Sequence, residues 1–233
     1  MRILFCPAII FTLLGCSITP NENITSKDGL FYEANSNKLF NGKVTLPAGV
    51  FEGIEGHSKG KIKDGKRIGL WTHFYPNGKL AKTSNWKNNL QDGLATYWYK
   101  NGKKEYEIYY KAGKQHGLAT IWYENGQKKI ESNWKDGEPD GLVTQWYENG
   151  QKKREVEITH ERVAGTAWYK NGQKKSESNH KDDKLESVTV WKPNGEKCAV
   201  TNFIDGNGVR VWYEEDGSES FRLNYKVSKP VRD

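Results

Sequence analysis

The sequence is poor in hydrophobic residues, in methionine and in proline. Only 35% of its 233 residues are hydrophobic and the mean hydropathy is −0.86, which excludes a protein with several membrane-spanning segments. Methionine occurs once and proline seven times, whereas glycine occurs 24 times and aromatic residues make up 12%. This balance favours short strands and tight turns over helices.

Charge of a single sign is not in large excess either. The 36 Lys and Arg residues face 29 Asp and Glu residues, which gives a formal net charge of +7, and both signs are interspersed along the chain. Charge alone therefore identifies no partner.

The longest apolar run lies at the amino terminus. Residues 3–14 are almost all apolar and are too few to cross a bilayer as a helix, so they predict a signal peptide over residues 1–15. The run ends in Leu13-Leu14-Gly15-Cys16, which resembles the bacterial lipobox. The alternatives are an ordinary signal peptide with an incidental cysteine and an uncleaved anchor.

The lipobox resemblance implies that Cys16 carries the lipid and becomes the new amino terminus. Two or more acyl chains anchor a protein stably, so the protein is expected in the bacterial cell envelope, tethered by residues 16–30. The residue after Cys16 is serine rather than aspartate, which favours the outer membrane by resemblance to known sorting. Export also argues against nucleic acid as a partner.

Cysteine usage agrees with export. Cys6 leaves with the signal peptide and Cys16 is used by the lipid, so Cys198 has no intramolecular disulfide partner. Since no fixed histidine and acid accompany Cys198, it is predicted to be a buried apolar residue rather than a nucleophile.

From residue 69 onward the sequence repeats. Glycines at 69, 93, 117, 141 and 165 each open a segment that runs to an aromatic pair and a turn glycine, a fixed period that indicates a repeat architecture. Seven units are counted, and residues 42–66 predict a degenerate eighth. The spacing of the turn glycines slips from 24 to 22 or 23 late in the array, at Gly78, Gly102, Gly126, Gly150, Gly172, Gly195 and Gly217.

Each unit predicts a β-hairpin. In residues 93–99 alternate side chains point to opposite faces, as in a strand, and residues 104–110 predict the second strand. Pro76 and Pro193 stand where a type I turn favours proline, so we predict a three-residue loop with the following glycine in a left-handed bulge, rather than a type I′ turn.

The order of glycine, aromatic pair and Asn-Gly resembles the bacterial variant of the MORN repeat, a β-hairpin module found in antitoxins of the YwqK family. The resemblance covers residues 40–226. Three units depart from it: the unit at 165 lacks two residues before its tryptophan, Ser187 replaces an opening glycine, and the last unit has an extra residue before Asp216-Gly217.

The predicted fold is all-β: an elongated, single antiparallel meander of about 14 to 16 strands. The array is placed at residues 31–226 and a tail at 227–233. With no helix to cover a face, stability is expected to come from ladders of side chains between adjacent hairpins, a nearest-neighbour sum. A compact sandwich or barrel from the same strands is the alternative.

The meander brings pairs of lysines that follow the Asn-Gly turns to one edge. This edge is a candidate site for an acidic protein, anionic lipid or an anionic polymer. The alternative is that these lysines are solvated or pair across strands with Glu105, Glu131, Glu155 and Glu177. The lysines are Lys103, Lys104, Lys128, Lys129, Lys152, Lys153, Lys174 and Lys175.

Catalytic motifs are scarce. There is no phosphate-binding Gly-Lys-Ser/Thr loop and no Gly-x-Ser-x-Gly elbow, so no catalytic residue, cofactor or metal site is expected. The histidines lack metal-ligand spacing; they are His57, His73, His116, His160 and His180.

These observations predict a non-enzymatic envelope lipoprotein that acts as a protein-interaction scaffold. The family resemblance sharpens this to an immunity protein that sequesters a toxin acting in the envelope. Exposed aromatic side chains on the less covered face are a second candidate contact surface. The alternative is a lipid- or polymer-binding accessory subunit of an envelope enzyme.

Overall fold

The computed structural model describes residues 24–51, 54–159, 162–227 and 229–231. The predicted signal peptide and Cys16 lie outside these residues. The described residues contain strands and turns only. Accordingly, this part of the chain has no helix with the length and apolar character needed to cross a bilayer.

Two sheets are formed. A small one pairs β1 with β2, and the large one holds β3 to β19, each strand hydrogen-bonded antiparallel to the next one along the chain. The strands are β1 Ile24–Lys27, β2 Leu30–Glu33, β3 Gly42–Phe51, β4 Ile54–Lys63, β5 Lys66–Phe74, β6 Leu80–Lys87, β7 Leu90–Trp98, β8 Lys104–Lys111, β9 Lys114–Trp122, β10 Lys128–Lys135, β11 Glu138–Trp146, β12 Lys152–Ile158, β13 Arg162–Trp168, β14 Lys174–Lys181, β15 Lys184–Val190, β16 Asn202–Ile204, β17 Asn207–Tyr213, β18 Glu219–Lys226 and β19 Lys229–Val231.

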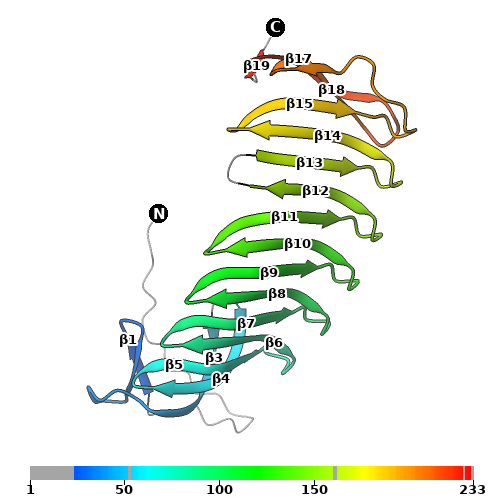
Figure 1. Cartoon of the computed structure of the whole chain (residues 1–233). Coiled ribbons are helices and arrows are strands. Elements are labelled where there is room, and N and C mark those ends of the chain that lie inside the picture. The colour runs from blue at the N-terminus through cyan, green and yellow to red at the C-terminus, as the bar shows by residue number, and fades with distance from the viewer. Residues whose placement is uncertain (1–23, 52–53, 160–161, 228, 232–233) are drawn as a thin grey trace.

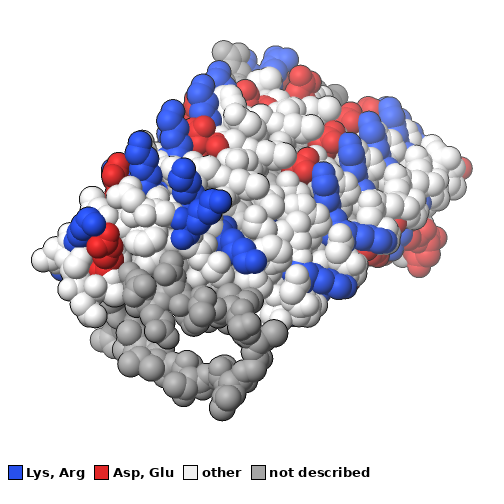
Figure 2. All heavy atoms as spheres, turned by 90° about the horizontal axis from the view of Figure 1, so that it is seen from below, with Lys and Arg blue, Asp and Glu red and all other residues white. Residues whose placement is uncertain are grey.

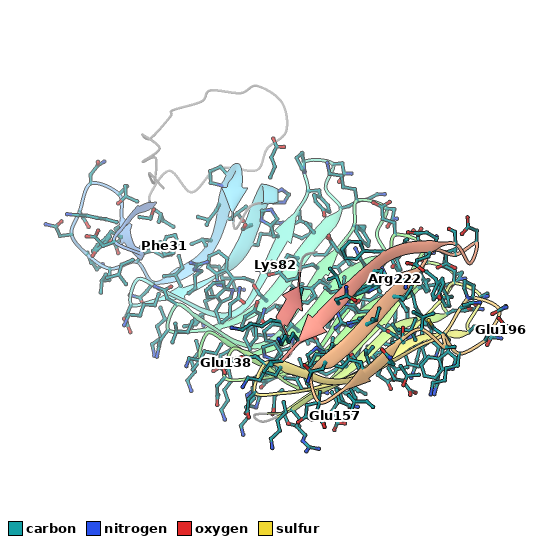
Figure 3. The ribbon with its side chains drawn as sticks, turned by 90° about the horizontal axis from the view of Figure 1, so that it is seen from above. Phe31, Lys82, Glu138, Glu157, Glu196 and Arg222 are labelled. Atoms are coloured by element: carbon teal, nitrogen blue, oxygen red, sulfur yellow. The ribbon has the colours of Figure 1, made fainter. Side chains whose placement is uncertain are left out.

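The large sheet confirms the predicted meander. Figure 1 shows its hairpins stacked one above the next along the molecule, and the view from above shows successive strands rotating about that direction, the twist expected of strands (Figure 3). The sheet has 17 strands rather than 14 to 16. β3 and β4 lie within residues 42–66, the stretch predicted as the degenerate eighth unit that precedes the others, and the short strands β16 and β19 raise the number of strands further.

The β1–β2 hairpin begins inside the segment expected to be a tether. Its Phe31 main-chain N–H donates to the carbonyl of Gly65 at 2.9 Å, and the Phe31 and Trp71 rings stack with centroids 6.5 Å apart. Residues 24–33 are therefore folded against the first hairpins of the array. In the same way, β19 lies in the segment expected to be the tail.

Each regular unit contains two different turns. At the first rim Tyr99 N–H donates to Lys103 O (2.9 Å) and Gly102 N–H donates to Tyr99 O (2.8 Å). Of these turn residues only Gly102 has a positive φ, +90°, which confirms the predicted type I turn with a glycine bulge and excludes type I′. The other rim is closed by two residues of positive φ, such as Ala112 and Gly113, as in a type I′ turn.

The unit glycines lie inside strands, three residues after each strand begins, so the prediction that they open the strand is wrong. Gly93 and Gly117 have φ of +115° and +74°, and the pairing register shifts beside them. A β-bulge with a left-handed residue is the conformation that glycine provides most readily.

Gly165 is not equivalent to these glycines, although it keeps the 24-residue spacing. It pairs with Val156 in a ladder without a bulge, just as Ala119 pairs with Ile108. The two missing residues are thus lost from the start of β13, before Gly165. Ser187 likewise does not replace a glycine. It precedes Val188, which pairs with Ser178 as Ala119 pairs with Ile108, so Ser187 occupies the position of Leu118.

The last unit is shifted by one residue. Trp212 pairs with Phe221 as Tyr97 pairs with Tyr106, so Trp212 does not occupy the position of the other unit tryptophans. The prediction of an extra residue before Asp216-Gly217 is wrong, because the turn has the regular length: Gly217 N–H donates to Glu214 O at 3.1 Å, as Gly102 N–H donates to Tyr99 O. The tryptophan of this unit, and not the turn, is displaced by one residue.

The buried core is divided into three clusters along the array. The first surrounds Ile62 and Trp71, and the last surrounds Val188 and Val211. The middle one is built on small residues: Ala95 and Ile108 are fully buried and Ala119 is 3% exposed. Adjacent hairpins therefore supply one another's core, as a nearest-neighbour repeat requires.

Candidate interaction surface

The large sheet presents two chemically different faces. We call the face that carries Ala95, Tyr97 and Ile108 the groove face, and the opposite one, with Leu94 and Thr96, the ladder face. Alternation along each strand places these residues on opposite sides, and the cross-strand pairs keep that assignment from hairpin to hairpin.

A central row crosses the groove face from strand to strand. Consecutive members are direct cross-strand partners from β5 to β15. The row begins polar, becomes aromatic and then aliphatic, is polar at Gln145 and Arg154, and ends in the small residues Ala167 and Ser176 and in Val190. Its members are His73, Lys82, Tyr97, Tyr106, Ile121, Ile130, Gln145, Arg154, Ala167, Ser176 and Val190.

The aromatic and aliphatic part of this row is hollowed. A groove of about 730 Å³ lies over β7 to β12, and most of its lining is apolar. Tyr97, Tyr106, Ile121, Ile130 and Trp134 line it. A concave, largely apolar site of this size is typical of ligand- and partner-binding sites.

The polar start of the row is a feature that the sequence analysis missed. Ser58 Oγ lies 2.6 Å from His73 Nδ1, and Lys82 places its Nζ 4.6 Å from the centroid of the Tyr97 ring. Ser58, His73 and Lys82 are each 2–3% exposed, so this Ser–His pair is not open to a substrate. Only the register could have revealed it, because the three residues are far apart in the sequence.

The ladder face carries a repeated Lys–Glu–Trp arrangement. Lys104 bonds Glu107 on its own strand at 2.6 Å and places its Nζ 5.6 Å from the ring centroid of Trp122 in the next hairpin. The same geometry recurs three times, with Lys128–Glu131 near Trp146, Lys152–Glu155 near Trp168, and Lys174–Glu177 near Trp191.

The predicted lysine edge exists, but each of its eight lysines has a partner. Besides the four above, Lys129, Lys153 and Lys175 lie over turn tyrosines, and Lys103 Nζ donates to Asn125 O at 2.7 Å. The acidic partner of the first pair is Glu107 rather than the predicted Glu105, and the pairs form within a strand rather than across strands. Figure 2 shows basic side chains in rows with acidic ones beside them.

The turn glycines named from the sequence lie on one rim, where side chains connect successive turns. Tyr99 Oη donates to Trp122 O at 2.6 Å, and Asn101 Nδ2 donates to Glu124 O at 3.3 Å. Equivalent tyrosine bonds join the turns on either side. Burial raises the pKa of Tyr169 to about 12, so this hydroxyl remains a donor well above neutral pH.

The ladder face also has an exposed leucine column. The leucine after each regular unit glycine is between 44% and 57% exposed, and the bulge beside it repeats in each unit. Large exposed apolar side chains that line up are unlike the scattered ones common on surfaces. The column consists of Leu70, Leu94, Leu118 and Leu142.

Cys198 is the free cysteine of the described residues. It is buried, 2% exposed, as predicted, and its Sγ lies 3.1 Å from Tyr213 Oη. Burial raises its thiol pKa, but hydrogen bonds with Thr201 and Tyr213 more than offset this and lower it. In the part of the chain that the structure describes, no three His, Cys, Asp or Glu side chains converge as a metal site would require.

The repeat geometry agrees with comparison to known families. Four tandem units match the MORN repeat variant. The matches cover residues 67–88, 91–112, 115–136 and 139–159, that is, β5 to β12 with their turns. No curated protein sequence matches the chain. MORN repeats suggest a repeat-based binding or scaffold role, and the groove of about 730 Å³ lies on the matched units.

Proposed function

We propose that the protein is a non-enzymatic scaffold that binds a protein partner through the groove face. The observation that carries this proposal is the apolar groove over β7 to β12. Its aromatic lining suits a protein interface, because buried tyrosine and tryptophan supply much of the binding energy at such interfaces. The groove is built by consecutive hairpins, so its length follows from the number of regular units.

We propose that the protein is located in the bacterial envelope, with the chain anchored by a lipid on Cys16. The support is the apolar run and lipobox-like ending of the sequence. Within this proposal the finer reading is an immunity protein whose partner is a toxin acting in the envelope. A Cys16→Ser variant should move from the membrane fraction to the soluble fraction, and persistence in the membrane fraction would contradict lipid anchoring.

Site-specific photo-cross-linking in cells tests the binding surface. A photoreactive residue at Ile121 lies in the groove, whereas one at Leu118, which is 52% exposed, lies on the ladder face of the same strand. We expect a discrete protein adduct from position 121, lost when Ile130→Glu places a charge in the groove, and absent from position 118. Adducts from position 118 alone would assign the interface to the other face.

A further inference from the structure

A second hollow lies at the far end of the groove face. It measures about 300 Å³, or roughly ten times the volume that a water molecule occupies in the liquid. Its floor is made of small residues, with Gly165 and Ala167 from β13 and Ser176 and Ser178 from β14. Missing side-chain volume at four neighbouring positions explains why the sheet is hollowed there.

Two arginines from distant parts of the chain line this hollow. Arg154 comes from β12 and Arg210 from β17. Arg154 belongs to the central row, and Arg210 lines the same hollow from β17, together with Val211, Trp212 and Tyr213 of that strand. The Arg210 guanidinium carbon lies 4.6 Å from the centroid of the Trp212 ring, which holds it in place.

Neither arginine has an ion-pair partner among the described residues. The Nε of Arg210 is buried and has no hydrogen-bond partner there. Burial lowers the pKa of Arg210, and the charge of Arg154 adds to this, against Tyr225, which raises it. The remaining titratable groups that line the hollow are Lys175 and Tyr213, so its lining carries no carboxylate.

The charges of the two arginines also affect the pKa of His180. Burial lowers the pKa of His180, and the charges of Arg210 and Arg154 add to this, against a main-chain hydrogen bond at Val163 that raises it. An uncompensated cation away from water is costly, and a bound anion removes that cost. Arginine guanidinium groups recognise carboxylate and phosphate through paired, charge-assisted hydrogen bonds.

We propose that the hollow between Arg154 and Arg210 binds an oxyanion, a carboxylate or phosphate group. The two guanidinium groups bind the charge, and the hydroxyls of Ser176 and Ser178 are available as further donors. This site is separate from the apolar groove, and its test requires no protein partner.

The test is a titration of the purified protein with sodium phosphate, and in a parallel arm with sodium acetate, at constant ionic strength. The Nε–Hε signals of the arginines are followed by NMR. We expect saturable shifts of the Arg154 and Arg210 signals. The affinity should be at least tenfold weaker in Arg154→Gln, followed at Arg210, and in Arg210→Gln, followed at Arg154. Saturation by acetate as well as phosphate identifies a carboxylate-accepting site, and saturation by phosphate alone identifies a phosphate site.

The matched control is Lys111→Gln, which also removes one positive charge but lies at an exposed strand end far along the array. It should bind the anions as the unaltered protein does. Arg154 is exposed, so Arg154→Gln should fold even if Arg210→Gln, which loses the stacking on Trp212, does not. Absence of saturation with both anions, or an equal loss in Lys111→Gln, would overturn the proposal.

Discussion

The hydroxyl of Tyr123 donates a hydrogen bond to the main-chain carbonyl of Trp146, 23 residues further along the chain, at 2.8 Å. The bond joins the turn of one hairpin to the strand of the next. Because the same bond recurs from Tyr75, Tyr99, Tyr147 and Tyr169, it contributes to the fixed spacing of the array.

Tyr123→Phe tests the contribution of this bond to stability. Removing the hydroxyl leaves the Trp146 carbonyl without this donor, so the free energy of unfolding should fall by about 1 kcal/mol, measured by urea denaturation. Tyr109→Phe is the matched control, because Tyr109 is 45% exposed and its hydroxyl makes no hydrogen bond among the described residues. An equal effect of the two variants would contradict the inter-unit role of the bond.

Gly117 and Gly165 should respond differently to alanine. Gly117 has a φ of +74° with open space around the missing Cβ, so Gly117→Ala costs stability through backbone strain alone, about 1 kcal/mol or more. Gly165 has no positive φ, and its added Cβ would lie 3.4 Å from Glu155 O and Val156 Cγ2. Gly165→Ala should therefore change the unfolding free energy by less than Gly117→Ala does.

This pair of variants also tests the register of the drifted units. If Gly165 were equivalent to Gly117, as its 24-residue spacing in the sequence predicts, the two substitutions would lower the free energy of unfolding equally in thermal or urea unfolding. The larger cost at Gly117 follows only from the shifted register of the structure.

Each Lys–Glu pair of the ladder face should contribute little to the free energy of unfolding. Lys128 and Glu131 are about half and a third exposed, and exposed pairs are typically worth about 0.2–1 kcal/mol. A double-mutant cycle of Lys128→Gln and Glu131→Gln should give a coupling energy in that range, falling in 1 M salt. A coupling well above this, or one insensitive to salt, would mean that the nearby Trp146 ring shields the pair from solvent.

Alkaline pH should destabilise the fold through its buried tyrosines. Burial raises the pKa of Tyr169 to about 12, and the pKa of Tyr213 is raised to about 12 by its hydrogen bond with Cys198 and by burial. Since the folded state holds these protons more tightly, the stabilisation is fully present below pH 10 and is lost as the pH rises from 10 to about 12.

The measurement is the free energy of unfolding against pH, together with tyrosinate absorbance in the folded protein. Tyr169→Phe should flatten the decline between pH 10 and 12. Ionisation of every tyrosine near pH 10 without loss of structure would contradict the prediction.

The repeat explains why the sequence predicted most of the fold. The spacing of Gly102 and its equivalents, together with the proline at two of these turns, was enough to predict the hairpin and its turn type. These are local signals, because the left-handed conformation is required at one residue whatever surrounds it. The meander then follows from copying the hairpin.

The remaining features depend on register, which spacing alone does not determine. Gly165 keeps the 24-residue period, but in the ladder it takes the place of Ala119, two positions after the bulge glycine Gly117. The neighbouring positions of Ser58, His73 and Lys82 become apparent only when β4, β5 and β6 are aligned. The hollow between Arg154 and Arg210 depends on the curvature that brings β17 to the same hollow as β12 and β13. A single sequence carries no signal for that long-range curvature.

Hydrogen exchange of an Ile108→Ala variant tests most directly whether each hairpin is stabilised by its neighbours. Ile108 is fully buried between Ala95 and Ala119 of the adjacent strands, and removing a side chain of this kind costs about 2–5 kcal/mol. Protection should fall most in β7 to β10 and remain nearly unchanged in β3, β4, β17 and β18. A uniform loss across all the strands would contradict the nearest-neighbour account.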